Sequence, residues 1–268
     1  MNEYNELNNK IASVEILYED DYIIVLNKPY GMVVNRSKTS PNNTIQDFIE
    51  GKYDFIKDFD VSLLQNIISN DPLDVDNTDM LSDIDIDEFT TRSGVLHRLD
   101  KDTSGVLLVA KDPITFKKIK HQFKSRTVQK EYTAVVMGEV GDEKIEIDAP
   151  IKRSPASPLK FAVVEDGKPA LTLIEKIKVI KKEEAKFTVL RVFPKTGRTH
   201  QIRVHLSAIN HPIAGDPIYL SKYNYEMTFK IFNRLMLHSS ALSFEHPHLN
   251  EVVRYESPLS EDFSKSIA

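Results

Sequence analysis

The sequence contains no cysteine in its 268 residues. That absence excludes a disulfide framework, a thiolate metal site and a thiol nucleophile. Long apolar runs are also missing, because stretches such as Tyr22–Leu26 and Val106–Ala110 are far too short to span a bilayer. The polar, acidic start of the chain lacks the basic residues and apolar core of a secretory signal. We therefore expect a cytoplasmic protein without membrane association.

The charge of the chain is unevenly distributed. Hydrophobic residues make up 41% and charged residues 28%, as in ordinary globular proteins with a sizeable core. Residues 41–90 hold 13 acidic and 2 basic residues, so the net charge of −5 leaves +6 for the rest of the chain. Residues 91–134 alone hold 10 Lys or Arg against 4 Asp or Glu. The negative total therefore does not exclude a nucleic-acid partner.

Hydrophobic periodicity and turn residues predict an α+β fold. Strands are expected at Tyr22–Asn27, Gly105–Lys111, Val128–Val140, Leu171–Val179, Phe187–Phe193 and Leu235–Phe244. Helices are expected after Thr44 to about Gly51, after Asp112-Pro113 to about Arg126, and over Thr199–Asn210. Strands predominate and strict βαβ alternation is missing. We therefore expect a mainly antiparallel or mixed central sheet with flanking helices.

One domain is predicted over residues 14–260, with flexible termini at 1–13 and 261–268. An acidic, loop-like insertion is expected at about 52–91, because dense like charges repel one another and resist compaction. Within it, Ser62–Ile68 is the one stretch compatible with a short amphipathic helix.

The segment His97–Gly105 is the first candidate for chemistry. Asp100 lies between Arg98 and Lys101, and nearby positive charge keeps a carboxylate ionised. The following residues offer hydroxyls and a close backbone approach suited to phosphate or sugar: Thr103, Ser104 and Gly105. A turn aspartate held by a salt bridge to Arg98 is an equally open reading of the residues alone.

A second candidate is Lys195–His205, where a Gly-Arg-Thr turn leads into a helix N-terminus that favours anions. His200 and Arg203 lie on neighbouring parts of one helix face, while Ile202, Leu206 and Ile209 pack inward. A solvated basic face is the alternative. His200 and His205 make a poor metal site, since no Cys or nearby Glu completes a ligand set. In a third segment, Lys130–Gly138, Tyr132 by itself is more typical of a core aromatic.

Together these segments resemble a family. His-Arg-Leu-Asp-x-x-Thr-Ser-Gly, Lys-x-Tyr-x-Ala-x-Val-x-Gly and Gly-Arg-Thr-His-Gln-Ile-Arg-Val-His occur in the order found in the RluA family of RNA pseudouridine synthases. The flanking stretches Ile16–Gly31, His211–Asp216, Leu237–Leu242 and His246-Pro247 resemble its opening and closing motifs. The resemblance runs from about residue 14 to 260, apart from the insertion.

The resemblance implies a role for each matching residue. Asp100 matches the nucleophile, and Arg203 matches the basic residue that pairs with it. Tyr132 matches the tyrosine that packs against the target base and is proposed to help remove the C5 proton. Arg98 matches the arginine proposed to fill the space of the flipped base. Further RNA contacts are expected at His97, Lys101, Thr103, Ser104, Arg126, Lys130, Arg198 and His200.

The implied reaction is the isomerisation of specific uridines to pseudouridine in structured ribosomal or transfer RNA, after base flipping. An isomerisation implies no cofactor and no metal, and we expect a monomer. Attack at C1′ and attack at C6 of the base both remain open. Two other functions stay possible: an RNA chaperone or assembly factor on the same fold, and a glycosidase-like hydrolase that releases uracil.

The chain departs from the family pattern in two places. Asn35-Arg36 stands where family members often have His-Pro, which puts the RNA contact of the first loop in question. Many relatives also carry an N-terminal S4 RNA-binding domain. Only about 13 residues precede the resembling region, so we expect no such domain here.

Overall fold

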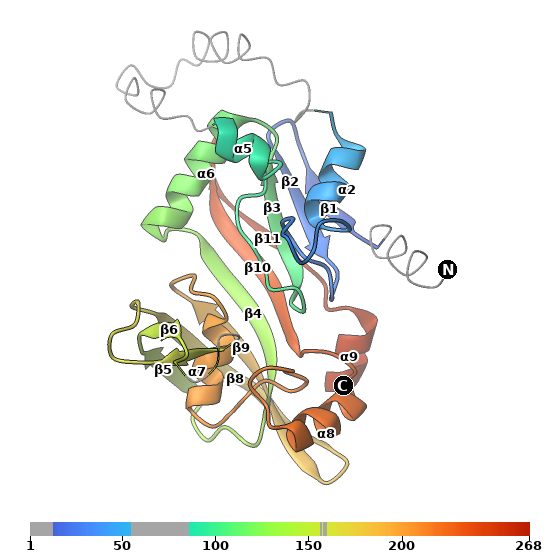
Figure 1. The fold of residues 1–268 in the computed structure, drawn as a ribbon, viewed down its shortest axis with the longest axis vertical. Helices are drawn as coiled ribbons and strands as arrows, with labels where there is room; N and C mark the ends of the chain where they lie inside the picture. Colours follow the sequence, from blue (N-terminus) through green and yellow to red (C-terminus); the bar gives the residue numbers. More distant parts are fainter. Residues whose placement is uncertain (1–12, 55–85, 156, 158–159) are drawn as a thin grey trace.

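The computed structural model describes residues 13–54, 86–155, 157 and 160–268. A nine-stranded sheet extends along the molecule (Figure 1). Its strands, in spatial order, are β1 (Glu15–Glu19), β2 (Ile23–Lys28), β3 (Ser104–Ala110), β10 (Leu237–His246), β4 (Gln129–Met137), β9 (Ala185–Pro194), β8 (Leu171–Lys182) and β5 (Lys144–Asp148), with β11 (Glu251–Glu256) paired to β10. A separate hairpin joins β6 (Ile151–Arg153) and β7 (Phe161–Val163).

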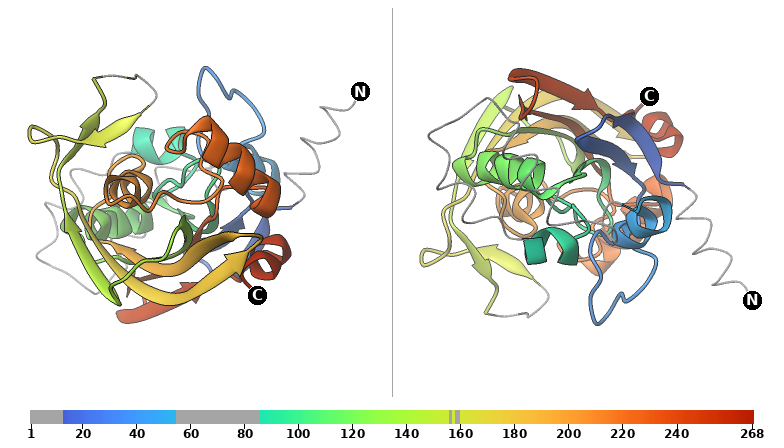
Figure 2. Two further views of the ribbon diagram at one scale, coloured as in Figure 1. Left: turned by 90° about the horizontal axis from the view of Figure 1, so that it is seen from below. Right: turned by 90° about the horizontal axis from the view of Figure 1, so that it is seen from above.

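The sheet is mixed, as predicted. Strands β3 and β10 run parallel, and every other pairing of the named strands in the described residues is antiparallel. The flanking helices are α2 (Ile45–Lys52), α5 (Ile86–Thr91), α6 (Pro113–Ser125), α7 (Gln201–Ala208), α8 (Lys222–Phe232) and α9 (Glu261–Ile267). Figure 2 shows the sheet curved, with α7 on its concave side. The predicted α+β class is therefore confirmed.

Two helices begin where their capping residues predict. The hydroxyl of Thr44 accepts a hydrogen bond from the backbone N–H of Asp47, and the carboxylate of Asp47 accepts one from the backbone N–H of Thr44. Asp112 accepts from the backbone N–H groups of Ile114 and Thr115, with Pro113 at the first helical position. Each cap satisfies donors that the first turn of a helix leaves free.

The core lies on both faces of the central strands. All seven residues of β3 are buried. Because side chains alternate along a strand, Val106 and Leu108 pack beneath α6, while Leu107 and Val109 face α2. A further cluster joins β4, β8, β9 and β10 to α7, α8 and α9. None of the helices in the described residues has the length and apolarity needed to cross a membrane.

Gly105 allows β3 and β10 to approach each other closely. Its φ is +112°, and a Cβ at this position would lie 2.1 Å from the carbonyl oxygen of Ser239. Only glycine fits such a conformation and such a gap. The close approach predicted for Gly105 is real, but its partner is the backbone of β10 rather than phosphate or sugar. This corrects one expectation from the sequence.

The end of the chain also differs from its prediction. Residues 261–268 were expected to be flexible, yet they include α9, whose Phe263 is fully buried. The guanidinium of Arg234 lies 5.5 Å from the ring of Phe263, and it donates to the hydroxyl of Ser260 at 2.9 Å. Burial of one aromatic side chain and these contacts hold a segment whose polar sequence suggested a free end.

Part of the predicted insertion is helical. Residues 86–91 form α5, where we expected a loop, because Phe89 is buried beside Phe116 at a ring distance of 5.7 Å. The remaining prediction for residues 55–85, including the Ser62–Ile68 helix, lies outside the described residues.

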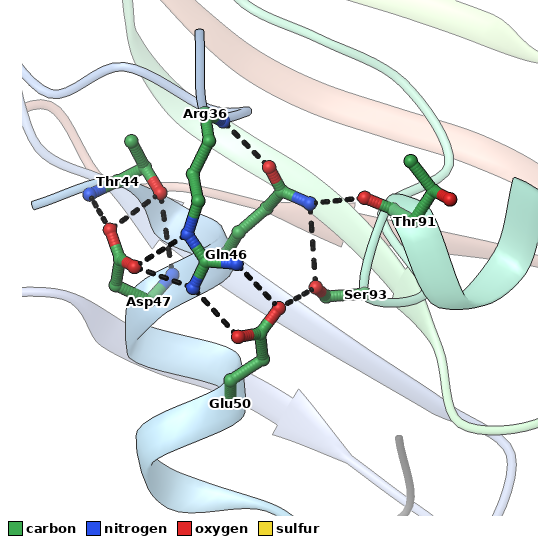
Figure 3. A network of polar contacts seen from close by, with 7 residues as sticks. All are labelled: Arg36, Thr44, Gln46, Asp47, Glu50, Thr91 and Ser93. Carbon is green, nitrogen blue, oxygen red and sulfur yellow. Dashed lines mark hydrogen bonds and ion pairs between the residues drawn. The ribbon is translucent and has the colours of Figure 1, made fainter. Parts of the chain in front are cut away.

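A polar network connects α2 to the end of α5 and the residues that follow it (Figure 3). Arg36 pairs with the carboxylates of Asp47 and Glu50. The side chain of Gln46 accepts from the backbone of Arg36 and donates to the carbonyl of Thr91. Arg36 stands where the family often has proline, and its charge is engaged by two carboxylates of α2.

Candidate active site

A cleft of about 490 Å³ brings the three candidate segments together. Its walls come from the loop before β3, the end of α6, the start of β4 and the turn leading into α7. The register explains the meeting point, because His238 of β10 pairs with Ser104 of β3 on one side and Thr133 of β4 on the other. Asp100 and Tyr132 therefore reach the same space from opposite sides of β10.

The loop that carries Asp100 is held by a tight turn and by the buried ammonium of Lys28. The N–H of Thr103 donates to the carbonyl of Asp100 at 3.1 Å and closes a tight turn. Lys28 is fully buried, and its ammonium donates to the carbonyls of Pro29, Met32 and Lys101. A buried ammonium requires such acceptors, so the charge of Lys28 holds the turn in place.

Arg203 lies between two carboxylates. Its Nη1 donates to Oδ2 of Asp100 at 3.1 Å. Its Nε and Nη2 donate to the two carboxylate oxygens of Asp216, each at 2.8 Å. The side chains of Arg203 and Asp216 are 3% and 0% exposed, whereas that of Asp100 is 22% exposed. Asp216 therefore anchors Arg203, and Arg203 presents a charged donor to a carboxylate that still faces the cleft.

The charges around Arg203 settle its protonation. Burial by itself would lower the pKa of Arg203, but hydrogen bonds and charge from Asp216 and Asp100 outweigh it and raise that pKa. The guanidinium thus stays cationic next to Asp100. The expected pair between Arg203 and Asp100 is present. The sequence also left open a salt bridge between Asp100 and Arg98, but the partner of Asp100 in the structure is Arg203.

Tyr132 lies in β4 against two hydrophobic clusters and lines the cleft. Burial raises the pKa of Tyr132 to about 12; the charge of Asp100 adds to the rise and a hydrogen bond with Ser239 opposes it. Tyr132 therefore meets the cleft as a neutral hydroxyl on an aromatic ring.

The cleft is strongly basic. Asp100 is the one acidic side chain among the described residues that line it, beside eight Lys or Arg. These are Arg92, Arg98, Lys124, Arg126, Lys130, Lys195, Arg198 and Arg203. Burial lowers the pKa of Lys130 to about 8, assisted by the charges of Arg126 and Lys195. Such a lining attracts a polyanion.

The cleft contains most of the other predicted contacts. Thr103, His97, Arg98, Arg126, Lys130, Arg198 and His200 all line it. His97 accepts the backbone N–H of Leu108 through Nε2, and burial lowers its pKa to about 3, so its imidazole is neutral. His97 thus shapes the wall as a neutral ring stacked on Phe123.

Two predicted contacts lie elsewhere. Ser104 is buried, with its hydroxyl 2.8 Å from Nδ1 of His238 and accepting from Arg234 at 2.6 Å. Lys101 is exposed and lies outside the cleft lining. Its carbonyl accepts hydrogen bonds from the ammonium of Lys28 and the backbone N–H of Gly31. Strand geometry turns Ser104 inward, which spacing in the motif did not reveal. The structure therefore removes both residues from the cleft.

The histidine considered as a metal ligand with His200 is part of the core. Nδ1 of His205 lies 2.8 Å from the hydroxyl of Thr172, and its Nε2 lies 2.9 Å from the carbonyl of Ala149. Throughout the described ranges, no group of three His, Cys, Asp or Glu is placed to hold a metal ion.

Sequence reasoning missed Asp216 and Tyr219. Asp216 belongs to a stretch that resembles a family motif, but the sequence assigned it no role. Tyr219 lies three residues later, with its hydroxyl 3.0 Å from Nδ1 of His200. The sequence offered no signal for either contact, because both pairs span more than a dozen residues. Two cleft residues, Arg92 and Lys124, were visible in the sequence only as charges without an assigned role, and Lys195 only as the start of the second candidate segment.

Comparison with known proteins decides the family. The family model described as RNA pseudouridylate synthase matches residues 22–208, which include Asp100, Tyr132 and Arg203. The chain belongs to this family. The resemblance predicted from the ordered motifs is thereby confirmed.

Curated relatives agree with this family assignment. The chain is 36% identical over 254 residues to "Ribosomal large subunit pseudouridine synthase D" of Nitrosomonas europaea, covering 94% of this chain and 63% of that protein. It is 35% identical over 254 residues to "Uncharacterized RNA pseudouridine synthase YlyB" of Bacillus subtilis, covering 95% and 72%. The chain thus spans about two thirds of the length of these family members.

Solved structures share the fold. "Human RNA Pseudouridylate Synthase Domain Containing 1" matches with a TM-score of 0.67 and 23% identity, over 93% of this chain and 84% of that one. "Human RNA Pseudouridylate Synthase Domain Containing 4" matches with a TM-score of 0.65 and 23% identity, over 98% and 96%. At this identity the likeness speaks for the fold alone.

Proposed function

We propose that this chain isomerises uridine to pseudouridine in RNA, with Asp100 as the nucleophile and large-subunit ribosomal RNA as the substrate. The observation that carries the proposal is the Asp100–Arg203 pair inside a basic cleft. Family membership supplies the reaction class. The names of relatives, such as the one from Nitrosomonas europaea, support the ribosomal substrate.

The reaction needs a carboxylate that is ionised, oriented and accessible. It breaks the N1–C1′ bond, turns the base, forms a C5–C1′ bond, releases the C5 proton and adds a proton to N1. Arg203 occupies Oδ2 of Asp100, and among the described residues no hydrogen bond to Oδ1 is found. Oδ1 is therefore the oxygen proposed to attack, at C1′ or at C6 of the base. The bond that it forms breaks again when C5 attacks C1′, or when C6 releases the carboxylate, so that Asp100 is regenerated.

Tyr132 is proposed to pack against the turning base. Tyr132 and Asp100 line the same cleft, and the Tyr132 pKa of about 12 keeps its hydroxyl protonated. A neutral hydroxyl passes on a proton through a hydrogen bond more readily than it acts as a free phenolate base. Help in removing the C5 proton would therefore take the form of a relay.

Access to the cleft is proposed to require base flipping. In a paired uridine the neighbouring bases of the helix cover the N1–C1′ bond, and removing the base from the stack costs a few kcal/mol. Uridines in loops are therefore the cheapest substrates. Arg98 is proposed to occupy the vacated space, since it is exposed and lines the cleft. Phosphate contacts by the basic lining would make affinity fall as salt rises.

The direct test is tritium release from C5-tritiated large-subunit ribosomal RNA. Wild type is expected to release tritium, and Asp100→Asn is expected to release none. Asp102→Asn is the matched control, because it removes a charge from the same loop at a residue outside the cleft lining. Equal release by wild type and Asp100→Asn would refute the assignment of Asp100.

Product analysis separates the remaining alternatives. A synthase leaves pseudouridine in the RNA, whereas a glycosidase-like hydrolase releases free uracil, which chromatography detects. If Asp100→Asn lost modification but fully rescued cells lacking the gene, RNA binding would be the important activity. Mapping pseudouridine in those cells, in ribosomal and transfer RNA, identifies the target position.

A further inference from the structure

The turn from Asp216 to Tyr219 fixes two side chains that flank Asp100. Asp216 anchors Arg203 and also accepts the backbone N–H groups of Ile218 at 2.8 Å and Tyr219 at 3.1 Å. The ring of Tyr219 packs 5.3 Å from the guanidinium carbon of Arg203. Tyr219 is therefore held through both its backbone and its ring, on the side of Arg203 that faces His200.

The hydroxyl of Tyr219 has a defined set of partners. It accepts the backbone N–H of Phe161 at 3.0 Å and lies 3.0 Å from Nδ1 of His200. Burial raises the pKa of Tyr219, so the hydroxyl keeps its proton. A phenol has one proton to donate. Over the described part of the chain, Nδ1 of His200 is the acceptor placed to receive it.

The protonation of His200 follows from the same contacts. Burial lowers the pKa of His200 below its usual value, against the opposing charge of Asp100. The other charges that act on it are Arg203, Asp216 and Arg98. At neutral pH the imidazole therefore carries one proton. Since Nδ1 accepts from Tyr219, that proton belongs on Nε2.

The Nε2 atom of His200 lies next to the nucleophile. It is 3.8 Å from Oδ2 of Asp100, which is beyond hydrogen-bond length. A proton at this position attracts the carboxylate, whereas a lone pair would repel it. The N–H is thus close to Asp100 without being used by it, and it remains available to a third group in the cleft.

We infer that Tyr219 is a positioning residue that fixes His200 as its Nε2–H tautomer and thereby gives the cleft a neutral hydrogen-bond donor for an oxygen of the bound nucleotide beside Asp100. This inference rests on the proposed function. The ring oxygen O4′ is bonded to C1′ and shares the positive charge that develops there, so it is a poor acceptor. Two other oxygens of a uridine lie near C1′: the ribose 2′-hydroxyl and O2 of the base. A donor at O2 would stabilise charge on the departing base, and one at the 2′-hydroxyl would recognise ribose.

The first test needs no activity. Nitrogen-15 NMR of histidine side chains in the full chain reports the tautomer, with His200→Gln to assign the signal. Wild type is expected to show a protonated Nε2 and an unprotonated Nδ1 at neutral pH. Tyr219→Phe is expected to give mixed tautomers, while Tyr223→Phe, which removes a hydroxyl from a side chain 77% exposed, changes nothing. An Nδ1–H tautomer or an imidazolium in wild type would overturn the inference.

The second test measures turnover on a stem–loop that contains the mapped uridine. Tyr219→Phe is expected to lower kcat about tenfold or more with KM nearly unchanged. His200→Ala is expected to lower kcat at least as much, and the double variant should be no slower than His200→Ala. His200→Gln, whose amide N–H lies near the Nε2 position, is expected to recover part of the rate. Additive losses in the double variant would contradict action through His200.

Modified substrates identify the oxygen. One stem–loop carries 2′-deoxyuridine at the target and another carries 2-thiouridine. On the substrate that lacks the oxygen bound by His200, wild type and His200→Ala should have nearly the same kcat. On the other substrate, His200→Ala should lower kcat as much as it does on unmodified RNA. Full effects on both substrates would refute the donor role. A wild type inactive on every RNA would instead refute the proposed function and leave the NMR result to decide the tautomer.

Discussion

Replacing Asp216 with asparagine is expected to destabilise the protein far more than the same change at Asp100, although both carboxylates bind Arg203. Asp216 is fully buried and makes two 2.8 Å hydrogen bonds to the guanidinium. It also accepts two backbone N–H groups. An asparagine keeps one acceptor oxygen and turns an amide N–H group toward guanidinium or backbone donors.

The magnitude follows from burial. Breaking a buried ion pair by removing one partner costs about 3–5 kcal/mol, because the other charge stays desolvated. In a chain of this size that corresponds to a fall in Tm of about 6–20 °C. Asp100 is 22% exposed, and its loss leaves Arg203 paired with Asp216. Asp100→Asn is therefore expected to change the free energy of unfolding by less than about 1 kcal/mol.

Thermal unfolding by calorimetry on wild type and the two variants tests this asymmetry. Asp100→Asn should abolish tritium release and leave the Tm nearly unchanged, whereas Asp216→Asn should lower the Tm. Chemical denaturation at one temperature provides the free energies directly. The division of roles around Arg203 would be wrong if the Tm of Asp216→Asn lay within about 2 °C of wild type. It would also be wrong if Asp100→Asn lowered the Tm as much as Asp216→Asn does.

Three further changes probe the frame of the site. Gly105→Ala would place a Cβ 2.1 Å from the carbonyl of Ser239, so we expect a loss of more than about 2 kcal/mol in denaturant unfolding. Lys28→Met leaves three carbonyls without their shared ammonium, and should cost about 3 kcal/mol or more by the same assay. The pKa of Lys130 is about 8 in the free protein, and phosphate favours its charged form. RNA binding should thus take up a proton and weaken by up to about tenfold from pH 7 to 9 at constant salt, whereas Lys130→Met should remove this pH dependence.

Local sequence signals predicted the regular elements well where they were strong. The caps at Thr44 and Asp112 mark the true helix starts, and the apolar run at Val106 lies in a fully buried strand. Weak signals failed. The polar C-terminal segment folds as α9 because Phe263 finds a pocket built by α8 and β10, which no local window contains.

The candidate site shows the same division. The motifs named Asp100, Tyr132 and Arg203, and the structure brings all three to one cleft. Spacing within the first motif also named Ser104 and Lys101, which the structure places outside that cleft. A strand alternates its side chains between two faces, and the pairing with β10 decides which face is interior.

By itself, the sequence determined the family, the candidate residues for the chemistry and their order, because each motif is a short stretch whose residue types are read locally. The tertiary structure decided how those residues are held. Asp216 and Tyr219 lie 13 and 19 residues from the side chains they orient, and Lys28 lies 73 residues from the loop it fixes. Hydrogen bonds across such separations exist only once the sheet has set the register. The protonation of His200 and the role of Arg203 are therefore properties of the fold.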